Sequence, residues 1–442
     1  MFKFEEMVIL FKHSESSLSY LSEKMAVYIE RRGVEMALQR DAIEFTKAFL
    51  SLLEEVDNVV EHCFDNHPMF QLQREQSFRT LINKNQLSAS FFADYCDSEM
   101  RKGWGQASEQ ETEKLLKAII QLFQYLQDRD IFIKLHTHYL AIRLLDYRVS
   151  YEIEQRLFAM LEIECGGYGS LRTVSGAFTE IHRSEKLAEE FRRDNRGAGL
   201  IDLEVRVLRE EYLQKLKIEH CTVPKELLQC VDRFEGYFGA KFPRRRLTWL
   251  LGHGQCELMA TFTAKPYTFI VTPYQAAILL LFNYHTSLNI NQIQKITNLK
   301  THTIETQLAH FFDPGSRLLV KQSPGYYIGE TDIISVWADF TCSTLTVNFV
   351  PKQTYSVFKR EKQLLDFQIE EHYRKYKVDC ALMCIAKRHS TISHEELLAE
   401  VKGQITFFQP RTALIELQIE SLILRKCLKR GKSDPAIYTY IP

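Results

Sequence analysis

The chain has almost no net charge, no long apolar run and no CxxC pair among its cysteines. The net charge of −1 provides no global field that would attract nucleic acid or an acidic membrane, so any electrostatic function must be local. No window approaches the roughly 18 uninterrupted apolar residues that a membrane helix needs. We therefore expect no membrane association and no nucleic-acid partner.

The ten cysteines are scattered, which fits free thiols in a reducing compartment better than a disulfide framework. The N-terminus, Met1 to Glu6, is acidic early and does not resemble a secretory signal. These features predict a cytoplasmic or nuclear protein. With 442 residues, 45% of them hydrophobic and 26% charged, the chain has the composition of an ordinary globular protein of three or four packed units.

Residues 1 to about 195 are predicted to be helical almost throughout. Apolar residues recur at helical spacing from Leu18 to Ile29, and Gly33 after two arginines predicts the end of that helix. Further helices are expected from Asp41 to Cys63 and from Glu111 to Leu126. Since no strand-like alternation interrupts this half, a helical bundle is predicted.

Residues 200 to 265 change to a mixed pattern. Leu203, Val205 and Val207 alternate with charged residues, which predicts a short half-buried strand. A helix is expected from Pro224 to Phe238, and two more strand-like stretches follow, Leu247–Trp249 and Cys256–Phe262. The pattern favours a small α/β unit.

Two later stretches each predict three helices followed by a hairpin, the plan of a winged helix. In the first, Thr272 and Gln275 form a capping pattern around Pro273, and the hairpin is expected from Leu318–Gln322 and Tyr326–Ile328. In the second, the pattern Ser393 to Glu396 opens the middle helix, and the expected hairpin strands are Leu428–Arg430 and Tyr438–Tyr440. A charged linker, Lys359 to Lys375, which we also expect to be helical, joins the two.

Five short motifs in order resemble the cullin family, over about residues 75–442. They are Tyr95-Cys96-Asp97, Leu140-Ala141-Ile142-Arg143-Leu144, Arg246-Leu247-Thr248-Trp249 with Cys256-Glu257-Leu258, the helix Pro273 to Asn283, and the ending Tyr438-Thr439-Tyr440-Ile441. One such motif would be weak, whereas five in order are specific.

The resemblance implies a mainly α fold with a small α/β sheet, a helical bundle and two winged helices. It implies the end of a cullin-type helical repeat over residues 1–90 and a four-helix-bundle-like region over 91–195. The cullin α/β homology domain would follow over 196–265, a first winged helix with its connecting segment over 266–358, and a linker helix with a C-terminal, neddylation-like winged helix over 359–442. The helical repeats that dock substrate adaptors in the family are expected to be missing.

The resemblance also implies a non-catalytic scaffold of a ubiquitin ligase, without a cofactor or a metal. Its partners would be a RING-box protein, a ubiquitin-conjugating enzyme, a ubiquitin-like modifier and a cullin-associated dissociation factor. In the family the RING-box protein adds a strand to the α/β sheet, which relies on backbone hydrogen bonds at a sheet edge. The residues that would supply the sheet here are Leu203, Val205, Val207, Leu247, Trp249 and Leu258.

One departure counts against the guest strand, because Glu211-Tyr212-Leu213 replaces the family's Trp-Pro after the first strand. A closed sheet without a guest is the alternative. The basic run Arg244, Arg245 and Arg246 is either a contact for the acidic tail of a conjugating enzyme, as in cullins, or a solvated turn.

Alignment with the family's C-terminal motif places the modified lysine at Lys387. Lys387 lies nine residues after Val378, so at about 100° per residue it projects roughly 180° away from the apolar helix face. The lysine is kept, but Cys384, Ala386, His389 and Ser390 stand where the family has Arg, Met, Arg and Lys. Lys387 could also be one solvated lysine among many.

Other functions have weaker support in the sequence. A winged helix can bind DNA, but residues 377–442 hold ten Lys and Arg against seven Asp and Glu, a net charge of only +3. His253 and Cys256 could form a Cys/His nucleophile, yet no third member can be named. Cys380 and Cys384 would make only half of a metal site. Within the family, a degenerate cullin or a cullin-like subunit of the anaphase-promoting complex remains an alternative.

Overall fold

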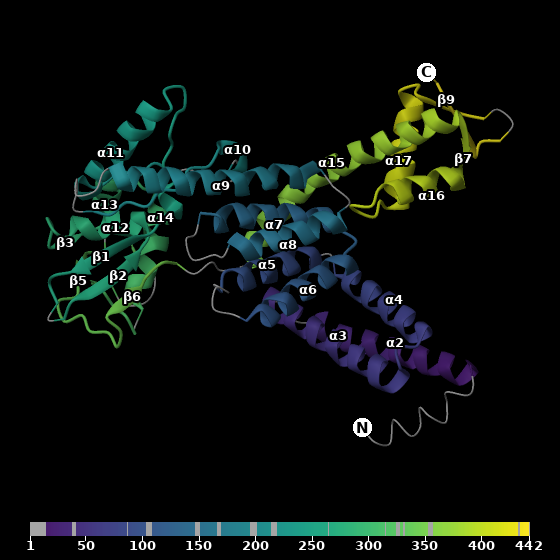
Figure 1. The fold of residues 1–442 in the computed structure, drawn as a ribbon, viewed down its shortest axis with the longest axis horizontal. Coiled ribbons are helices and arrows are strands. Elements are labelled where there is room, and N and C mark those ends of the chain that lie inside the picture. Colours follow the sequence, from purple (N-terminus) through teal and green to yellow (C-terminus); the bar gives the residue numbers. More distant parts are fainter. Residues whose placement is uncertain are drawn as a thin grey trace. The chain divides into compact units, whose positions relative to one another are not determined.

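The computed structural model divides into two compact units, one of residues 1–140, 149–171 and 355–442 and the other of residues 141–148 and 172–354 (Figure 1). The structure describes residues 15–37, 41–85, 87–102, 108–145, 151–165, 169–194, 201–213, 219–263, 265–313, 315–323, 328–329, 332–351, 357–431 and 434–441. No helix within these ranges is long and apolar enough to cross a membrane.

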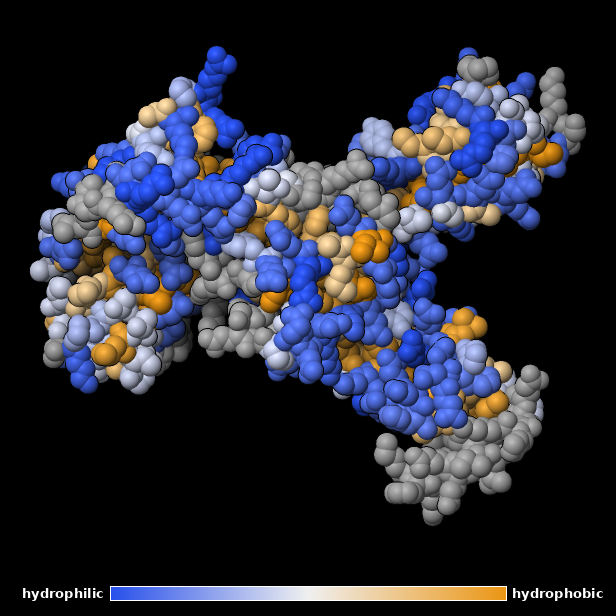
Figure 2. All heavy atoms as spheres, viewed as in Figure 1, coloured by the Kyte–Doolittle hydropathy of each residue, from blue (hydrophilic) through white to orange (hydrophobic). Residues whose placement is uncertain are grey.

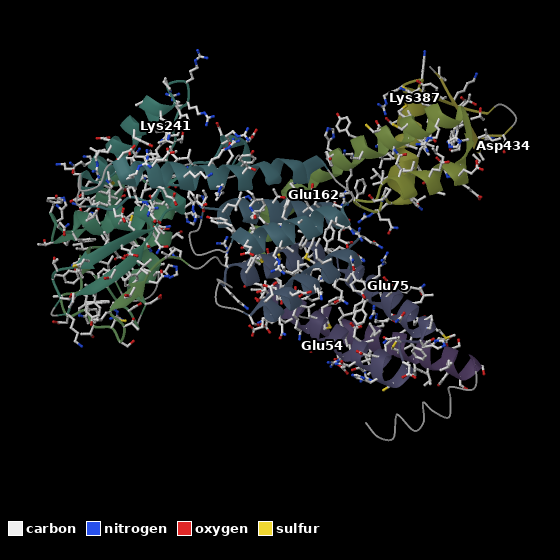
Figure 3. The ribbon with its side chains drawn as sticks, viewed as in Figure 1. Glu54, Glu75, Glu162, Lys241, Lys387 and Asp434 are labelled. Carbon is white, nitrogen blue, oxygen red and sulfur yellow. The ribbon has the colours of Figure 1, made fainter. Side chains whose placement is uncertain are left out.

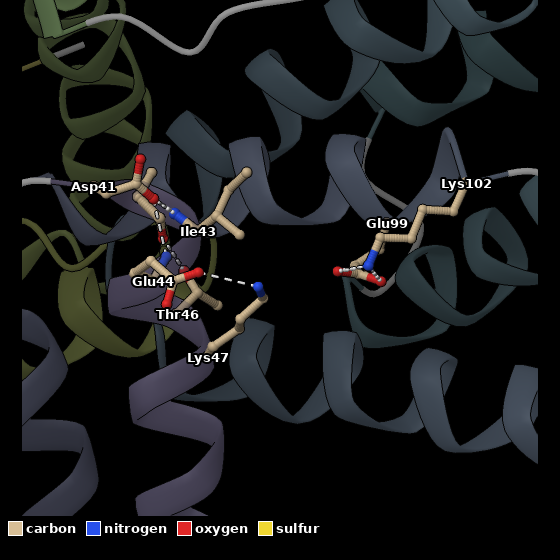
Figure 4. A network of polar contacts seen from close by, with 8 residues as sticks. Asp41, Ile43, Glu44, Thr46, Lys47, Glu99 and Lys102 are labelled. Atoms are coloured by element: carbon tan, nitrogen blue, oxygen red, sulfur yellow. Dashed lines mark hydrogen bonds and ion pairs between the residues drawn. The ribbon is translucent and has the colours of Figure 1, made fainter. Parts of the chain in front are cut away.

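The N-terminal part of the first unit is helical, as predicted. Its helices are α2 (Glu15–Ala37), α3 (Ala42–Phe64), α4 (Pro68–Lys84), α5 (Ser88–Met100), α6 (Glu109–Tyr125), α7 (Arg129–Arg143) and α8 (Tyr151–Glu164). Local chemistry fixes their starts. The Asp41 carboxylate accepts hydrogen bonds from the amides of Ile43 and Glu44 at 2.9 and 3.0 Å (Figure 4), and Ser108 caps α6 through a reciprocal contact with Glu111.

The predicted helix end at Gly33 is wrong, because α2 continues to Ala37. Gly33 is buried inside the helix, and a Cβ atom there would lie 1.8 Å from Cδ1 of Leu81 in α4. The glycine therefore allows α2 and α4 to approach closely, and it does not cap the helix.

Two of the sequence motifs contribute to the core of the helical bundle. In α5, Cys96 is buried and its Sγ lies 3.6 Å from Nδ1 of His136, while the neighbouring Asp94 accepts a hydrogen bond from the Tyr139 hydroxyl at 2.6 Å. Leu140 in α7 is buried as well, and Arg143, which ends α7 and belongs to the second unit, is fully buried. The polar contacts of Asp94 and Cys96 join α5 to α7, because buried polar groups need a partner.

The C-terminal part of the first unit is a winged helix. It consists of α15 (Val357–His389), β7 (Thr391–Ser393), α16 (His394–Gln404), α17 (Thr412–Leu424), β8 (Leu428–Arg430) and β9 (Ile437–Tyr440), with the sheet in the order β7-β9-β8. The predicted Ser393 capping box and both hairpin strands are confirmed. The linker and the first helix, predicted as separate, form one helix of 33 residues, α15.

The second unit begins with α9 (Gly169–Asp194, from residue 172), α10 (Glu210–Leu213) and α11 (Lys225–Lys241). A three-stranded sheet in the order β1-β2-β6 follows, formed by β1 (Cys256–Ala260), β2 (Tyr267–Val271) and β6 (Thr346–Asn348). The predicted helix at Pro224 and the strand at Cys256 are confirmed.

The second unit also contains the first winged helix. Its elements are α12 (Pro273–Leu281), β3 (Ser287–Leu288), α13 (Ile290–Thr297), α14 (Thr301–Leu308), β4 (Leu319–Lys321) and β5 (Ile334–Val336). The sheet order β3-β5-β4 repeats that of the C-terminal winged helix. Here β4 pairs with Ile334–Val336, whereas most of the predicted hairpin partner, Tyr326–Ile328, lies outside the described residues. The predicted fold class, mainly α with small sheets and two winged helices, is confirmed.

Candidate strand-docking and modification sites

A segment of extended backbone, Leu203 to Arg209, runs along α9. The amide of Val207 donates to Oγ of Ser184 at 2.6 Å, and the amide of Arg209 donates to Oε2 of Glu180 at 3.2 Å. Two residues of extended chain and four residues of helix both span about 6 to 7 Å, so alternate amides can meet successive turns of α9. The geometry fixes one edge of the segment against α9.

The prediction that Leu203–Val207 and Leu247–Trp249 are β-strands is wrong, because neither segment joins a sheet among the described residues. Within the described ranges, no backbone-to-backbone hydrogen bond is formed by Leu203, Val205, Leu247 or Trp249. Alternation in sequence predicts the extended conformation and the inward side chains. It does not determine whether a partner strand is present in the same chain.

Both segments lie against one aromatic cluster. Leu187 and Phe191 of α9, Phe234 and Phe238 of α11, and Val205 are buried in it. Phe191 and Phe234 meet edge to face with their ring centroids 5.1 Å apart, which joins the two helices. Trp249 packs on Phe234 at 5.9 Å, and its indole nitrogen donates to Glu235 at 2.7 Å. The helices thus form an apolar floor under the two segments, which join no strand ladder within the described residues.

Five of the six candidate sheet residues share this cluster: Leu203, Val205, Val207, Leu247 and Trp249. The structure places the sixth, Leu258, elsewhere, since it lies in β1 and packs against the core of the first winged helix. The basic run Arg244 to Arg246 is exposed, and none of its members forms an ion pair with another described residue. Arg245 stacks over the Phe242 ring at 5.0 Å.

Lys387 lies in the last turn of α15 and is exposed (Figure 3). Val378, on the opposite helix face, is completely buried. The Nζ of Lys387 is 5.8 Å from the centroid of the Tyr440 ring. Arg388 and His389 follow directly, and both face Glu400 of α16, with Nη1 of Arg388 3.7 Å from Oε2 and Nε2 of His389 2.8 Å from Oε1. Hydrophilic residues cover most of the visible face of this winged helix (Figure 2).

The geometry disfavours a cysteine nucleophile at Cys256. Burial raises the pKa of its thiol to about 11, so the thiolate is scarce at neutral pH. Cys380 and Cys384 are exposed on α15, and among the described residues no group of three or more potential metal ligands comes together.

Sequence reasoning missed Ser184 and Glu180, which anchor the extended segment, and Glu400, which faces the residues after Lys387. Ser184 and Glu180 are four residues apart and so share a helix face, but nothing in the sequence reveals what packs on that face. All three act through contacts between distant parts of the chain, which local patterns do not encode.

The chain belongs to the cullin family. Family models match in order along it: the cullin alpha solenoid domain over residues 2–188, the cullin alpha+beta domain over 207–340 and the cullin protein neddylation domain over 373–434. Residues 247–249 and the end of the first segment, from Val207 onward, lie in the second match, and Lys387 lies in the third.

Curated relatives include several cullins. Cullin-3 of Dictyostelium discoideum is 26% identical over 480 aligned residues, which cover 99% of this chain and 62% of that protein. Cullin-3A of Arabidopsis thaliana is 28% identical over 98% of this chain and 60% of its own length. Cullin-4A of Mus musculus is 26% identical over 99% and 58%. The chain thus spans about three fifths of the length of these relatives.

Proposed function

We propose that this chain is a non-catalytic scaffold of a ubiquitin ligase and that it binds a RING-box protein, which recruits a ubiquitin-conjugating enzyme. The observation that carries the proposal is the pair of segments, Leu203–Arg209 and Leu247–Trp249, which lie over the aromatic floor of α9 and α11 and join no strand ladder within the described residues. A strand from another protein can add to such an edge through backbone hydrogen bonds, while its alternate side chains enter the apolar cluster. Family membership supports the same function.

The contacts with α9 indicate which edge is available to a guest strand. Successive amides of an extended chain point to opposite edges. Since the amides of Val207 and Arg209 face α9, those of Glu204 and Leu208 face away from it. These two amides are our candidates for hydrogen bonds to the guest strand.

Co-expression with a RING-box protein tests this proposal. The wild-type chain is expected to co-purify with it at a stoichiometry of one to one. Glu204→Pro removes the outward amide but suits an extended backbone, so we expect roughly tenfold weaker binding. Glu204→Ala is the matched control, because it removes the same side chain and keeps the amide. If the wild-type chain stays alone, or if both variants bind equally well, the strand-docking proposal is wrong.

The exposed run Arg244 to Arg246 supports a contact with the conjugating enzyme. Three adjacent cations that form no ion pair with another described residue can attract an acidic segment and accelerate its association, particularly at low salt. Such steering does not require a pocket. We propose this run as the place where an acidic tail of the conjugating enzyme docks.

We further propose Lys387 as the acceptor of a ubiquitin-like modifier. The exposed amine would attack the thioester that links the modifier to its conjugating enzyme, forming an isopeptide bond and releasing the enzyme's thiol. In cells, Lys387→Arg should remove the band that is heavier by one modifier, while Lys402→Arg, which alters another exposed lysine of the same winged helix, should keep it. A band that persists in Lys387→Arg would rule out this site and leave the scaffold proposal intact.

A further inference from the structure

Glu400 contacts both of the residues that follow the acceptor lysine. Its two carboxylate oxygens lie 2.8 Å from Nε2 of His389 and 3.7 Å from Nη1 of Arg388. Arg388 and His389 end α15, and Ser390 follows with φ of 60°, which turns the chain toward β7. One carboxylate on α16 therefore offsets positive charge along the flank of Lys387.

We propose that Glu400 is a specificity-determining residue that masks the basic flank of Lys387 and thereby weakens recognition of this lysine by an acidic conjugating enzyme. This inference rests on the proposed role of Lys387 as an acceptor. It goes further by assigning a role to Glu400, which touches neither the amine nor the incoming acyl group.

The exposure of these side chains indicates that the masking is electrostatic. The side chains of Arg388, His389 and Glu400 are 63%, 39% and 34% exposed, and ion pairs this open contribute little to folding stability. Removing the carboxylate should therefore leave the winged helix folded, since its core is formed by other residues such as Val378, Ile385 and Leu397. The charge that a docking enzyme meets would nevertheless become more positive by one unit.

The gain of one positive charge matters for recognition because Arg388 and His389 lie directly beside Lys387. Arg388 and His389 adjoin Lys387 in sequence, and their distances from Glu400 place its charge well within the Debye length of about 8 to 10 Å at moderate salt. On another side of Lys387, Tyr440 contributes an uncharged ring near Nζ. Thus Arg388 and His389, the residues that Glu400 contacts, supply the positive charge beside Lys387. A partner attracted to that charge must carry an acidic surface.

The test is a reconstituted neddylation reaction that contains the activating enzyme, the conjugating enzyme, the modifier and the full chain with its RING-box protein. Glu400→Gln is expected to raise kcat/KM for modification of Lys387 about two- to fivefold at low salt, through a lower KM. The gain should shrink as salt is added. Glu395→Gln is the matched control, because it removes an equal charge from the same helix at an exposed residue that has no ion pair within the described residues. In the Glu400→Gln background, Arg388→Ala should reverse the gain.

The outcomes separate this inference from the proposal on which it rests. If Lys387 is modified in the wild type and Glu400→Gln reacts no faster than Glu395→Gln, the masking role is wrong and the acceptor proposal stands. A gain that does not depend on salt would also overturn it. If neither wild type nor Glu400→Gln is modified, the acceptor proposal fails and the inference fails with it. Modification of Glu400→Gln alone would be the strongest support.

Discussion

Gln275 shows how one polar side chain holds the second unit together. It is completely buried at the start of α12, where its Oε1 accepts the Thr272 amide at 2.9 Å. Its Nε2 donates to the carbonyls of Gln307 at 3.0 Å and Phe349 at 2.8 Å. One amide group thus caps a helix and also joins the helix to two distant parts of the unit.

We predict that Gln275→Met destabilises the protein substantially. Methionine has a similar size but leaves three buried backbone groups without this partner, so the free energy of unfolding should fall by about 2 to 4 kcal/mol. Gln292→Met is the control: Gln292 occupies the same position in the capping box of α13, but it is exposed, and its loss should cost under about 1 kcal/mol. Urea titrations of both variants measure the difference, and equal losses would contradict this account.

At the scale of elements, α15 is fastened to the helical bundle through Arg374. Its Nε and Nη2 lie 2.7 and 2.6 Å from the two oxygens of Asp130, and Nη2 is also 2.9 Å from Asp128. The guanidinium lies over the Phe408 ring, 4.8 Å from its centroid. Burial opposes the charged form, but hydrogen bonds and attraction from Asp130 and Asp128 outweigh it and raise the pKa of Arg374. The arginine remains charged at every ordinary pH.

Replacing Arg374 should loosen α15 locally. Arg374→Met removes a bidentate partner from the buried Asp130, and we expect the local stability of α15 around this residue to fall by about 2 kcal/mol. Its amides should then exchange hydrogen roughly 30-fold faster, provided that exchange reports local opening. Lys375→Met removes the neighbouring charge, which has no ion pair with another described residue, and should leave exchange nearly unchanged. Equal acceleration in both variants would contradict a specific role for Arg374.

Helix boundaries were predictable where the signal is local. The capping patterns at Thr272 and Ser393 each fix a helix start within a few residues, and both are observed. The helix expected from Asp41 begins at Ala42, with Asp41 as its cap. Contacts between distant segments were not predictable. Gly33 looked like a helix end because its role depends on Leu81 of another helix. The pairing of β4 with Ile334–Val336 is likewise a contact that no local pattern indicates.

The candidate sites were predictable to different degrees. The position of Lys387 on the exposed face of α15 follows from helical periodicity alone, and its role follows from the family resemblance. The five clustered residues of the docking surface share an inward-facing alternation, but the sequence could not show that their segments lack a ladder partner. The sequence of this chain alone cannot show that a strand from a second protein would pair with these segments.

At the scale of the whole molecule, two winged helices with the same strand order lie in different units of one chain. The C-terminal copy carries Lys387, and the unit with the other copy carries Leu203–Leu208. Under the proposed function, the acceptor lysine and the strand-docking segment therefore belong to different units.

The central claim is that a RING-box protein adds a strand to this chain beside Leu203–Leu208. Amide hydrogen exchange, measured with and without that protein, tests it most directly. The account predicts strong protection of the Glu204 and Leu208 amides and of residues 247–249 in the complex, while the amide of Val207, already bonded to Ser184, changes little. A complex that leaves the Glu204 and Leu208 amides exchanging as in the free chain, or no complex at all, would contradict it.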